Sequence, residues 1–339
     1  MKEILITGCR GQLGNEIQLL ASEYPHFHFF FTDREELDIT NEEQVMAFVE
    51  ANKITTIINC AAFTAVDKAE SEEALCDLLN HKAPGYLAAA MAKVGGEMVQ
   101  VSTDYVFDGN GHLPYVETDA TNPQTVYGRT KLAGEKAVME TCEKAMVVRT
   151  AWLYSTFGNN FVKTMIRLGR ERDNLGVIFD QIGSPTYARD LACAIMAAVD
   201  KGIVPGVYHF TNEGVCSWFD FTRAIHRIAG ITQCHVKPLH TEEYPTPAKR
   251  PHYSVLDKTK IKLTFGIDIP WWEDSLERAF PCLKKTDGHM VSGGCLISFN
   301  WLLVSRGSEF CNGEKRFEEL GNLFLCSVKI DRLILSPLL

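Results

Sequence analysis

Thr103, Tyr127 and Lys131 have the side chains needed to move a proton onto a carbonyl oxygen. Tyr127 and Lys131 are four residues apart, so on a helix they share one face, and no other tyrosine in the chain has a lysine at that spacing. A nearby cation lowers the pKa of a phenol, which is about 10 when unperturbed. We therefore predict that Tyr127 delivers a proton, that Lys131 assists it, and that Thr103 polarises the carbonyl. The alternative is an ordinary surface pair on a helix.

Carbonyl reduction also needs a hydride donor, and the N-terminal residues have the pattern of a dinucleotide site. An apolar run at 4–7 is followed by three glycines and then by an amphipathic pattern. Glycines let the backbone approach a pyrophosphate, and a helix N-terminus supplies free N–H groups. The predicted cofactor-binding residues here are Gly8, Gly11, Gln12, Leu13 and Gly14. Their spacing differs from the usual G-x-G-x-x-G, and a tight turn alone also uses glycine.

The end of the second predicted strand is where the adenosine ribose is expected. This strand, 27–32, runs into Asp33 and Arg34. Asp33 favours NAD, whereas Arg34 and Arg10 could accept a 2′-phosphate and favour NADP. The sequence therefore leaves NADPH and NADH open, and for Arg34 a solvated turn is an equal alternative.

Small and apolar residues after the next elements are predicted to complete the cofactor bed. Ligands of open α/β sheets bind at the carboxyl ends of the strands, which need small residues there. Ala62, Phe63 and Thr64 follow the predicted strand 54–59, and Asp38 and Ile39 are expected to lie beside the adenine of a dinucleotide.

Strand and helix patterns alternate along most of the chain. We predict strands at 4–7, 27–32, 54–59, 98–102, 145–149, 177–179 and 206–210. We predict helices at 42–52, 74–94, 130–143, 161–172, 190–200, 217–229 and 271–280, the first opened by a capping box of Thr40 and Glu43. Residues 239–254 are rich in proline and predicted to be an irregular loop. This order predicts a doubly wound parallel sheet covered by helices on both faces.

Composition narrows the classes of partner. The chain has 339 residues, a formal net charge of −9 and 11 cysteines without a Cys-x-x-Cys pair. The charge argues against nucleic-acid or anionic-membrane binding, and we expect reduced cysteines. With no signal-peptide pattern and no long apolar run, we expect a cytoplasmic protein that does not enter the membrane. No metal is predicted, because His235 and His240 lack acidic residues at ligand spacing.

The motifs together resemble those of the extended short-chain dehydrogenase/reductases over about residues 1–285. The specific ones are Thr-Ala-Val-Asp-Lys-Ala-Glu at 64–70, Ser-Thr-Asp-Tyr-Val-Phe-Asp-Gly at 102–109, Tyr-Gly-Arg-Thr-Lys at 127–131 and Gly-Asn-Asn-Phe at 158–161. The resemblance implies a Rossmann sheet with a smaller C-terminal substrate-binding domain. The expected domains are 1–150 plus about 176–200 for NAD(P), and about 151–175 plus 201–285 for the substrate. Residues 286–339 show no clear period and are either a natural extension or a tail unrelated to the fold.

The resemblance also implies roles for individual residues. It implies reduction of the 4-keto group of a dTDP-linked 6-deoxy sugar by NADPH or NADH, with Tyr127 as proton donor, Lys131 as its partner and Thr103 as polariser. Substrate contacts are expected from Thr103, Asp104, Trp152 and Asn160, and the loop near Arg250 could meet the nucleotide diphosphate.

Two points stay open at this stage. Some members of the family form a dimer through a magnesium ion held by glutamates. Here Glu16 fits that set of glutamates, but Arg189 stands where another acid would be, which argues against a dimer bridged by a metal ion. We expect either a monomer or a homodimer. Other functions that the pattern allows are another nucleotide-sugar reductase, an epimerase, or a non-catalytic regulatory subunit, although the last does not need Thr103, Tyr127 and Lys131.

Overall fold

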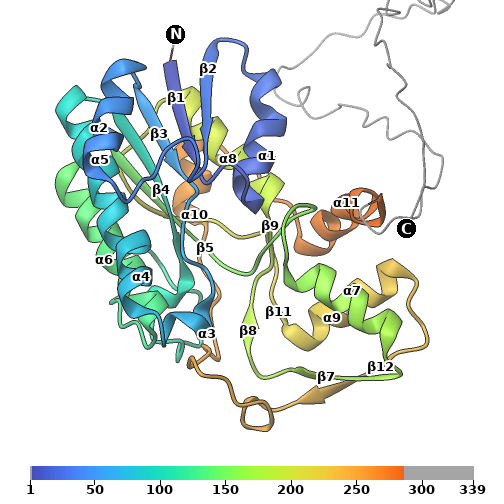
Figure 1. Cartoon of the computed structure of the whole chain (residues 1–339). Helices are drawn as coiled ribbons and strands as arrows, with labels where there is room; N and C mark the ends of the chain where they lie inside the picture. Colours follow the sequence, from blue (N-terminus) through green and yellow to red (C-terminus); the bar gives the residue numbers. More distant parts are fainter. Residues whose placement is uncertain (1, 286–339) are drawn as a thin grey trace, which may run out of the picture. The chain divides into compact units, whose positions relative to one another are not determined.

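The computed structural model describes residues 2–285. Its centre is a six-stranded parallel sheet in the order β10-β5-β4-β3-β1-β2 (Figure 1). The strands are β1 (Lys2–Thr7), β2 (Phe27–Thr32), β3 (Thr56–Asn59), β4 (Glu97–Thr103), β5 (Ala145–Thr150) and β10 (Gly206–His209). The winding reverses between β1 and β3, so the carboxyl ends of these two strands form the crevice in which such sheets bind ligands.

Helices cover both faces of this sheet, as predicted. The helices around it are α1 (Gln12–Leu20), α2 (Glu42–Ala51), α3 (Val66–Ala69), α4 (Glu73–Asp77), α5 (Ala83–Val94), α6 (Val126–Thr141), α8 (Ala188–Lys201) and α10 (Thr259–Phe265). Side chains alternate along a strand, and Ile4 and Ile6 pack with α1, α8 and α10. Leu5 points the other way and packs with α2 and α5. The two cores explain why the buried strands are almost continuously apolar.

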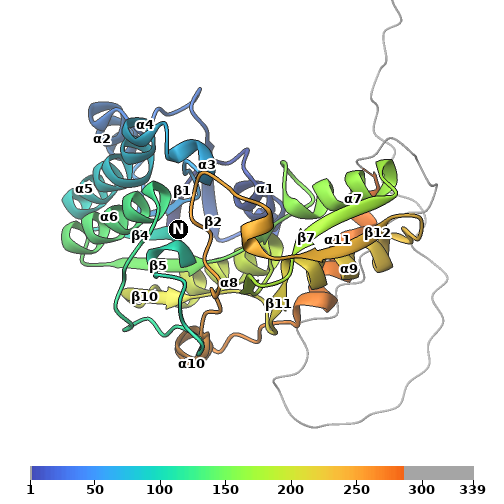
Figure 2. The same cartoon turned by 90° about the horizontal axis from the view of Figure 1, so that it is seen from below.

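The rest of the described chain forms a smaller part beside the sheet (Figure 2). It contains α7 (Phe161–Glu171), α9 (Trp218–Ala229), α11 (Trp272–Lys285), β7 (Asn174–Ile178) and β12 (His235–Leu239). Strands β7 and β12 pair with each other, and two pairs of short segments complete this part: β6 (Leu153–Tyr154) with β9 (Thr186–Tyr187), and β8 (Ile182–Gly183) with β11 (Cys216–Ser217). A separate core holds its helices together and includes Val162 of α7, Phe221 of α9 and Leu276 of α11.

Several predicted boundaries are wrong. The helix predicted at 74–94 is divided by a π-helical turn, η2 (Leu78–Lys82), followed by Pro84 in the first turn of α5. The loop predicted at 239–254 includes the last residue of β12 and holds a short 3₁₀ helix, η4 (Thr241–Glu243). Helix α10 was not predicted. The residues 286–339, predicted as an extension, lie outside the described residues.

The start of α2 differs from the predicted capping box. Asn41, not Thr40, is the N-cap, and its side chain accepts a hydrogen bond from the Gln44 amide. The Thr40 hydroxyl instead donates to Asp38 at 2.6 Å. Asparagine is at least as good an N-cap as threonine, so Asn41 rather than Thr40 is the N-cap of α2. Within residues 2–285 no helix is long and apolar enough to cross a membrane.

Candidate active site

Thr103 and Tyr127 meet at the carboxyl end of β4. Thr103 is the last residue of β4, and a 3₁₀ helix, η3 (Asp104–Val106), turns the chain away from the sheet. Helix α6 starts at Val126, four residues earlier than predicted, because the Thr125 side chain caps it by accepting from the Gly128 amide at 3.0 Å. The earlier start places Tyr127 in the first turn and Lys131 one turn later, on the same face.

The Thr103 hydroxyl is held by a buried carboxyl. It donates to Asp104 Oδ1 at 2.9 Å and accepts from the Tyr105 amide at 3.2 Å. Asp104 is only 4% exposed, and its second oxygen, Oδ2, is buried without a hydrogen-bond partner among the described residues. Burial raises the pKa of Asp104 to about 6, although hydrogen bonding with Thr103 and Ser254 opposes this.

The phenol of Tyr127 is protonated at neutral pH. Burial raises its pKa above the usual value, which hydrogen bonding with Thr103 only partly offsets, and the Asp104 charge raises it further. The predicted lowering of this pKa by Lys131 is therefore wrong for this structure. A raised pKa nevertheless keeps the hydrogen that a proton donor has to supply.

Lys131 is buried beside the end of β4. Its ammonium group donates to the Val101 carbonyl at 2.6 Å. Burial lowers the pKa of Lys131 to about 8, and the Glu135 carboxylate opposes the shift. The side chain is thus still largely charged at neutral pH, within the same buried region as Tyr127.

The glycine turn between β1 and α1 has the shape that a pyrophosphate needs. Gly8 has φ +62°, and a Cβ at Gly14 would meet the Gly8 carbonyl oxygen at 2.4 Å. Gly11 is the N-cap of α1 and has no side chain to cover the free N–H groups of the first turn. A dinucleotide therefore fits this turn through its diphosphate, with Gln12 and Leu13 supplying the first helical amides.

Charged side chains at the end of β2 are exposed and already paired in part. Asp33 accepts from the backbone amides of Arg10 and Arg34 at 3.2 and 2.9 Å. Arg10 forms ion pairs with Glu35 at 2.8 Å and Glu36 at 2.6 Å. Arg34 is exposed and next to Asp33 in the sequence.

Asp38 and Ile39 lie beyond this turn. The Asp38 carboxylate accepts from both the hydroxyl and the amide of Thr40, and these bonds lower its pKa. Ile39 is buried at 7% exposure, and it packs in the core under α2. The Asp38 carboxylate is thus held in place next to the buried Ile39.

Asn80, in the π-helical turn, was missed by the sequence reasoning. Its side chain accepts from the Phe63 amide at 2.8 Å and donates to the Phe63 carbonyl at 3.0 Å. These two bonds fix the backbone of the segment Ala62–Thr64 after β3. Such single π-turns are frequent at functional sites, and an asparagine inside an otherwise apolar helix is the signal that could have found it.

Trp152 and Asn160 lie where the sheet meets the smaller part. Trp152 has φ +49°, unusual for a bulky residue, and its indole stacks on Trp218 with ring centroids 3.5 Å apart. Asn160 caps α7, and its amide nitrogen donates to Gln12 Oε1 at 3.0 Å. Trp218 was not among the predicted site residues, and Asn160 connects the smaller part to the glycine turn.

The sequence matches known proteins along nearly all of this arrangement. The family model described as RmlD substrate binding domain matches residues 1–284. A dTDP-4-dehydrorhamnose reductase of Aggregatibacter actinomycetemcomitans is 42% identical over 287 residues, which is 82% of this chain and 98% of that protein. The chain belongs to the dTDP-4-dehydrorhamnose reductase family.

Solved structures of this family have the same fold. A dTDP-4-dehydrorhamnose reductase of Clostridium acetobutylicum superposes with a TM-score of 0.80 at 47% identity, covering 83% of this chain and 99% of that one. The corresponding enzyme of Bacillus anthracis, in complex with NADP, gives 0.79 at 42% identity, with 83% and 99% covered. A UDP-glucose 4-epimerase of Thermotoga maritima, at 20% identity, shares the fold alone, with a TM-score of 0.72.

In this member of the family, Arg250 joins the loop after β12 to the sheet. Its guanidinium pairs with Asp67 at 2.5 Å and donates to the Tyr105 hydroxyl at 3.0 Å. The Tyr105 ring in turn meets the Tyr127 ring edge to face, with centroids 5.5 Å apart. Asp67 and Arg250 are far apart in the sequence, so their spacing gave no indication of this contact.

The glutamate that the resemblance connects with a magnesium ion is used inside the chain. Glu16 is 1% exposed, accepts from the Ser155 hydroxyl at 2.6 Å and pairs with Arg189 at 3.2 Å. The cation beside Glu16 in this structure is therefore the Arg189 guanidinium.

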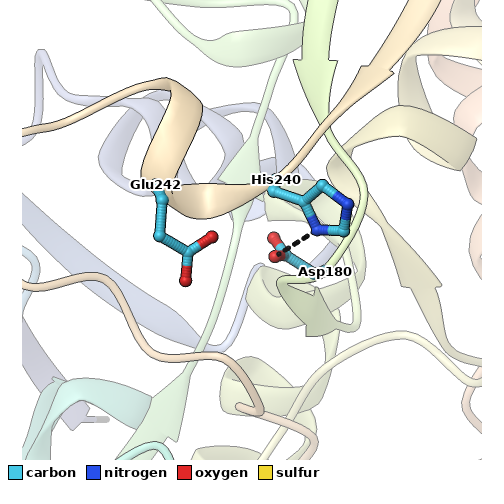
Figure 3. A group of neighbouring side chains, drawn as sticks. All are labelled: Asp180, His240 and Glu242. Carbon is cyan, nitrogen blue, oxygen red and sulfur yellow. Dashed lines mark ion pairs between the residues drawn. The ribbon is translucent and has the colours of Figure 1, made fainter.

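One group of potential metal ligands was not expected from the sequence. His240 lies near Asp180 and Glu242, with His240 Nδ1 3.5 Å from an Asp180 oxygen (Figure 3). The prediction that His240 lacks neighbouring acidic residues is wrong, because Asp180 and Glu242 lie close to it in the fold. Asp180 already accepts two hydrogen bonds from Thr241, and the His240 side chain is 63% exposed. These contacts stabilise the start of η4, which accounts for why the three side chains lie together.

Proposed function

We propose that this chain reduces the 4-keto group of dTDP-4-dehydrorhamnose with NADPH or NADH and forms dTDP-L-rhamnose, the last step of dTDP-rhamnose synthesis. Membership of the reductase family supports the substrate. The observation that carries the chemistry is that the buried Thr103 and Lys131 and the partly buried Tyr127 come together at the carboxyl end of β4. A regulatory subunit would not require these three groups together.

The glycine turn and the end of β2 would hold the cofactor. The amides at the start of α1 would bind the diphosphate, and Asp33 or Arg34 would meet the adenosine ribose or its 2′-phosphate. The segment Ala62–Thr64, fixed by Asn80, would lie along the cofactor at the end of β3. When bound, the nicotinamide supplies a hydride to the carbonyl carbon.

The side chains at the end of β4 would complete the reduction. Tyr127, protonated because it is buried, would donate its hydrogen to the sugar oxygen. Thr103 would hydrogen-bond the same oxygen and favour the charge that develops on it. The Lys131 ammonium would favour the phenolate that remains, and Trp152, supported by Trp218, would lie against the sugar ring and exclude water.

The test is oxidation of NADPH and of NADH by the purified protein, with the dTDP-4-keto sugar generated in place by its upstream enzymes. Turnover that requires the sugar, with dTDP-L-rhamnose identified by mass spectrometry and NMR, supports the proposal. Bound cofactor without turnover would contradict it and would favour a different sugar or a regulatory role. We also propose that the protein works in the cytoplasm as a monomer or homodimer, which light scattering after gel filtration distinguishes.

A further inference from the structure

The backbone of Trp152 has a conformation that a bulky residue seldom adopts. Trp152 comes shortly after the carboxyl end of β5, and its φ is +49°. Its carbonyl accepts from the Thr186 amide at 3.2 Å, and the Thr186 hydroxyl donates to the Ala151 carbonyl at 2.7 Å. Strained residues persist only where their surroundings fix them, and they are concentrated at ligand-binding sites. The strain therefore directs attention to the residues that hold this side chain.

Trp218 covers one face of the Trp152 indole. The two rings are stacked, with centroids 3.5 Å apart and planes 10° apart. Trp218 is the first residue of α9, and a capping box of Ser217 and Asp220 fixes the start of that helix. The Phe161 ring packs against Trp218 in turn, with centroids 4.5 Å apart. Trp218 is thus a fixed support, because the helix cap and a ring of α7 both hold it in place.

Gly183 leaves the room that the same indole fills. Gly183 is buried in β8, and a Cβ there would lie 2.7 Å from Trp152 Cε2 and 2.8 Å from Trp152 Cζ2. That Cβ would also meet Ser254 Oγ at 2.8 Å. Strand β8 pairs with β11, which ends at Ser217, the residue before Trp218. The glycine and the stacked ring therefore lie on connected elements of the smaller part, and both contact a side chain that comes from the end of the sheet.

We propose that Gly183 and Trp218 are positioning residues that form a slot for the Trp152 indole and thereby decide which face of the sugar carbonyl is reduced. This inference rests on the proposed function, in which Trp152 lies against the sugar ring. A ketone carbonyl has two faces, and hydride addition to one or the other gives opposite configurations at C4. A sugar that rests against a fixed wall turns only one of these faces towards the hydride donor.

An indole distinguishes the two sides of a sugar because it accommodates C–H groups better than hydroxyls. A sugar turned over on Trp152 would press different substituents against the ring. Any hydroxyl that lost water there without gaining a hydrogen-bond partner would be penalised. This discrimination needs an indole that stays in one orientation. If the ring could tilt, the sugar could bind both ways, and both C4 epimers would form.

The experiment compares Trp218→Leu with Trp218→Phe in the full-length protein. NMR gives the configuration at C4 of the product, stopped flow gives the single-turnover rate, and calorimetry gives the affinity for dTDP-L-rhamnose. Leucine removes the stacked ring, so the rate should fall about 10- to 10²-fold, the affinity for dTDP-L-rhamnose should fall, and the C4 epimer should appear. Phenylalanine keeps a ring that can stack, and it should restore most of the rate and a single product. NADPH affinity should be unchanged in both variants.

Gly183→Ala disturbs the slot from the other side. Its methyl group would displace the Trp152 ring while Trp218 is intact, so it should produce the same mixture of epimers. Gly169→Ala is the matched control in the smaller part, because its methyl group would meet the His226 ring at 2.4 Å. Overpacking should lower the melting temperature of both glycine variants. The control should nevertheless form one C4 epimer with the wild-type affinity for dTDP-L-rhamnose.

The outcomes separate this inference from the proposed function. If Trp218→Leu and Gly183→Ala fold and give a single C4 epimer with the wild-type affinity for dTDP-L-rhamnose, the slot is overturned and the reductase is left intact. A mixture of epimers from Gly169→Ala also overturns it, because any loosening of the smaller part would then have that effect. If one slot variant fails to fold, the other decides. A wild-type protein that does not turn over overturns the reductase, and with it the slot.

Discussion

The two ends of the predicted cofactor site are built differently. At the end of β4, Thr103, Asp104 and Lys131 are at most 4% exposed, and each takes part in a hydrogen bond of 2.9 Å or less. At the end of β2, Arg10 and Arg34 are exposed, and Arg10 is paired with surface glutamates. Charges in a low-dielectric region interact strongly, whereas exposed charges are screened by water and salt. Single changes should therefore have large effects at the first end and small effects at the second.

The largest effect is expected for Tyr127→Phe. It removes only the hydroxyl that donates the proton, so the single-turnover rate should fall by about 10²–10⁴-fold. NADPH affinity, measured by fluorescence titration, should change little because the ring remains packed against Tyr105. A variant that retained its rate would remove the proton-donor assignment.

The pH dependence above neutrality should report on Lys131. Its pKa is lowered to about 8, so the ammonium form is lost as pH rises through that value. If the ammonium favours the phenolate, the single-turnover rate should fall about tenfold per pH unit well above pH 8. Lys131→Met should abolish this part of the profile; a profile that remained unchanged would contradict the role of Lys131.

Gly14→Ala should disturb the glycine turn between β1 and α1, which lies between the two ends of the predicted cofactor site. Its new methyl group would lie 2.4 Å from a backbone oxygen, which cannot move away as a side chain could. Overpacking of this kind costs about 1–3 kcal/mol, so the melting temperature and the NADPH affinity should both fall. Gly85→Ala is the control, because its methyl group would meet Ala137 at an ordinary 3.7 Å within helix α5.

The smallest effect is expected at the exposed end. Arg34→Ala should raise KM for NADPH about three- to tenfold and leave KM for NADH unchanged, since one screened charge contact is lost. Arg10→Ala should change KM for NADPH less, because Arg10 is already engaged by Glu35 and Glu36. A larger effect of Arg10→Ala would reverse the assignment of the 2′-phosphate contact.

Local patterns were enough to predict the fold class. The strand, glycine turn and helix at the N-terminus, and the alternation of strands and helices along the chain, depend on apolar runs and turns that are visible within about ten residues. The errors lie where neighbouring residues compete for one role. Thr40 and Asn41 are both good N-caps, and only the Asp38 carboxylate, which engages Thr40, decides between them.

The candidate site was predicted less completely, because several of its contacts join distant parts of the chain. The contact between Asp67 and Arg250 spans most of the sequence, and the neighbours of His240 are a second example. The burial of individual side chains could not be predicted from the sequence either. The Tyr-x-x-x-Lys spacing suggested a lowered pKa for the Tyr127 phenol, whereas the surroundings of Tyr127 in the fold raise that pKa. The roles of the other predicted site residues stay predictions.

The stacked indoles of Trp152 and Trp218 give the enzyme a built-in optical reporter. Two nearly parallel chromophores, 10° apart in orientation and 3.5 Å apart between centroids, couple their electronic transitions. The pair should produce an exciton couplet in the circular dichroism spectrum, whose sign and size depend on the angle between the rings. A sugar that settles against Trp152 would change this signal, so substrate binding can be followed without a label and without turnover.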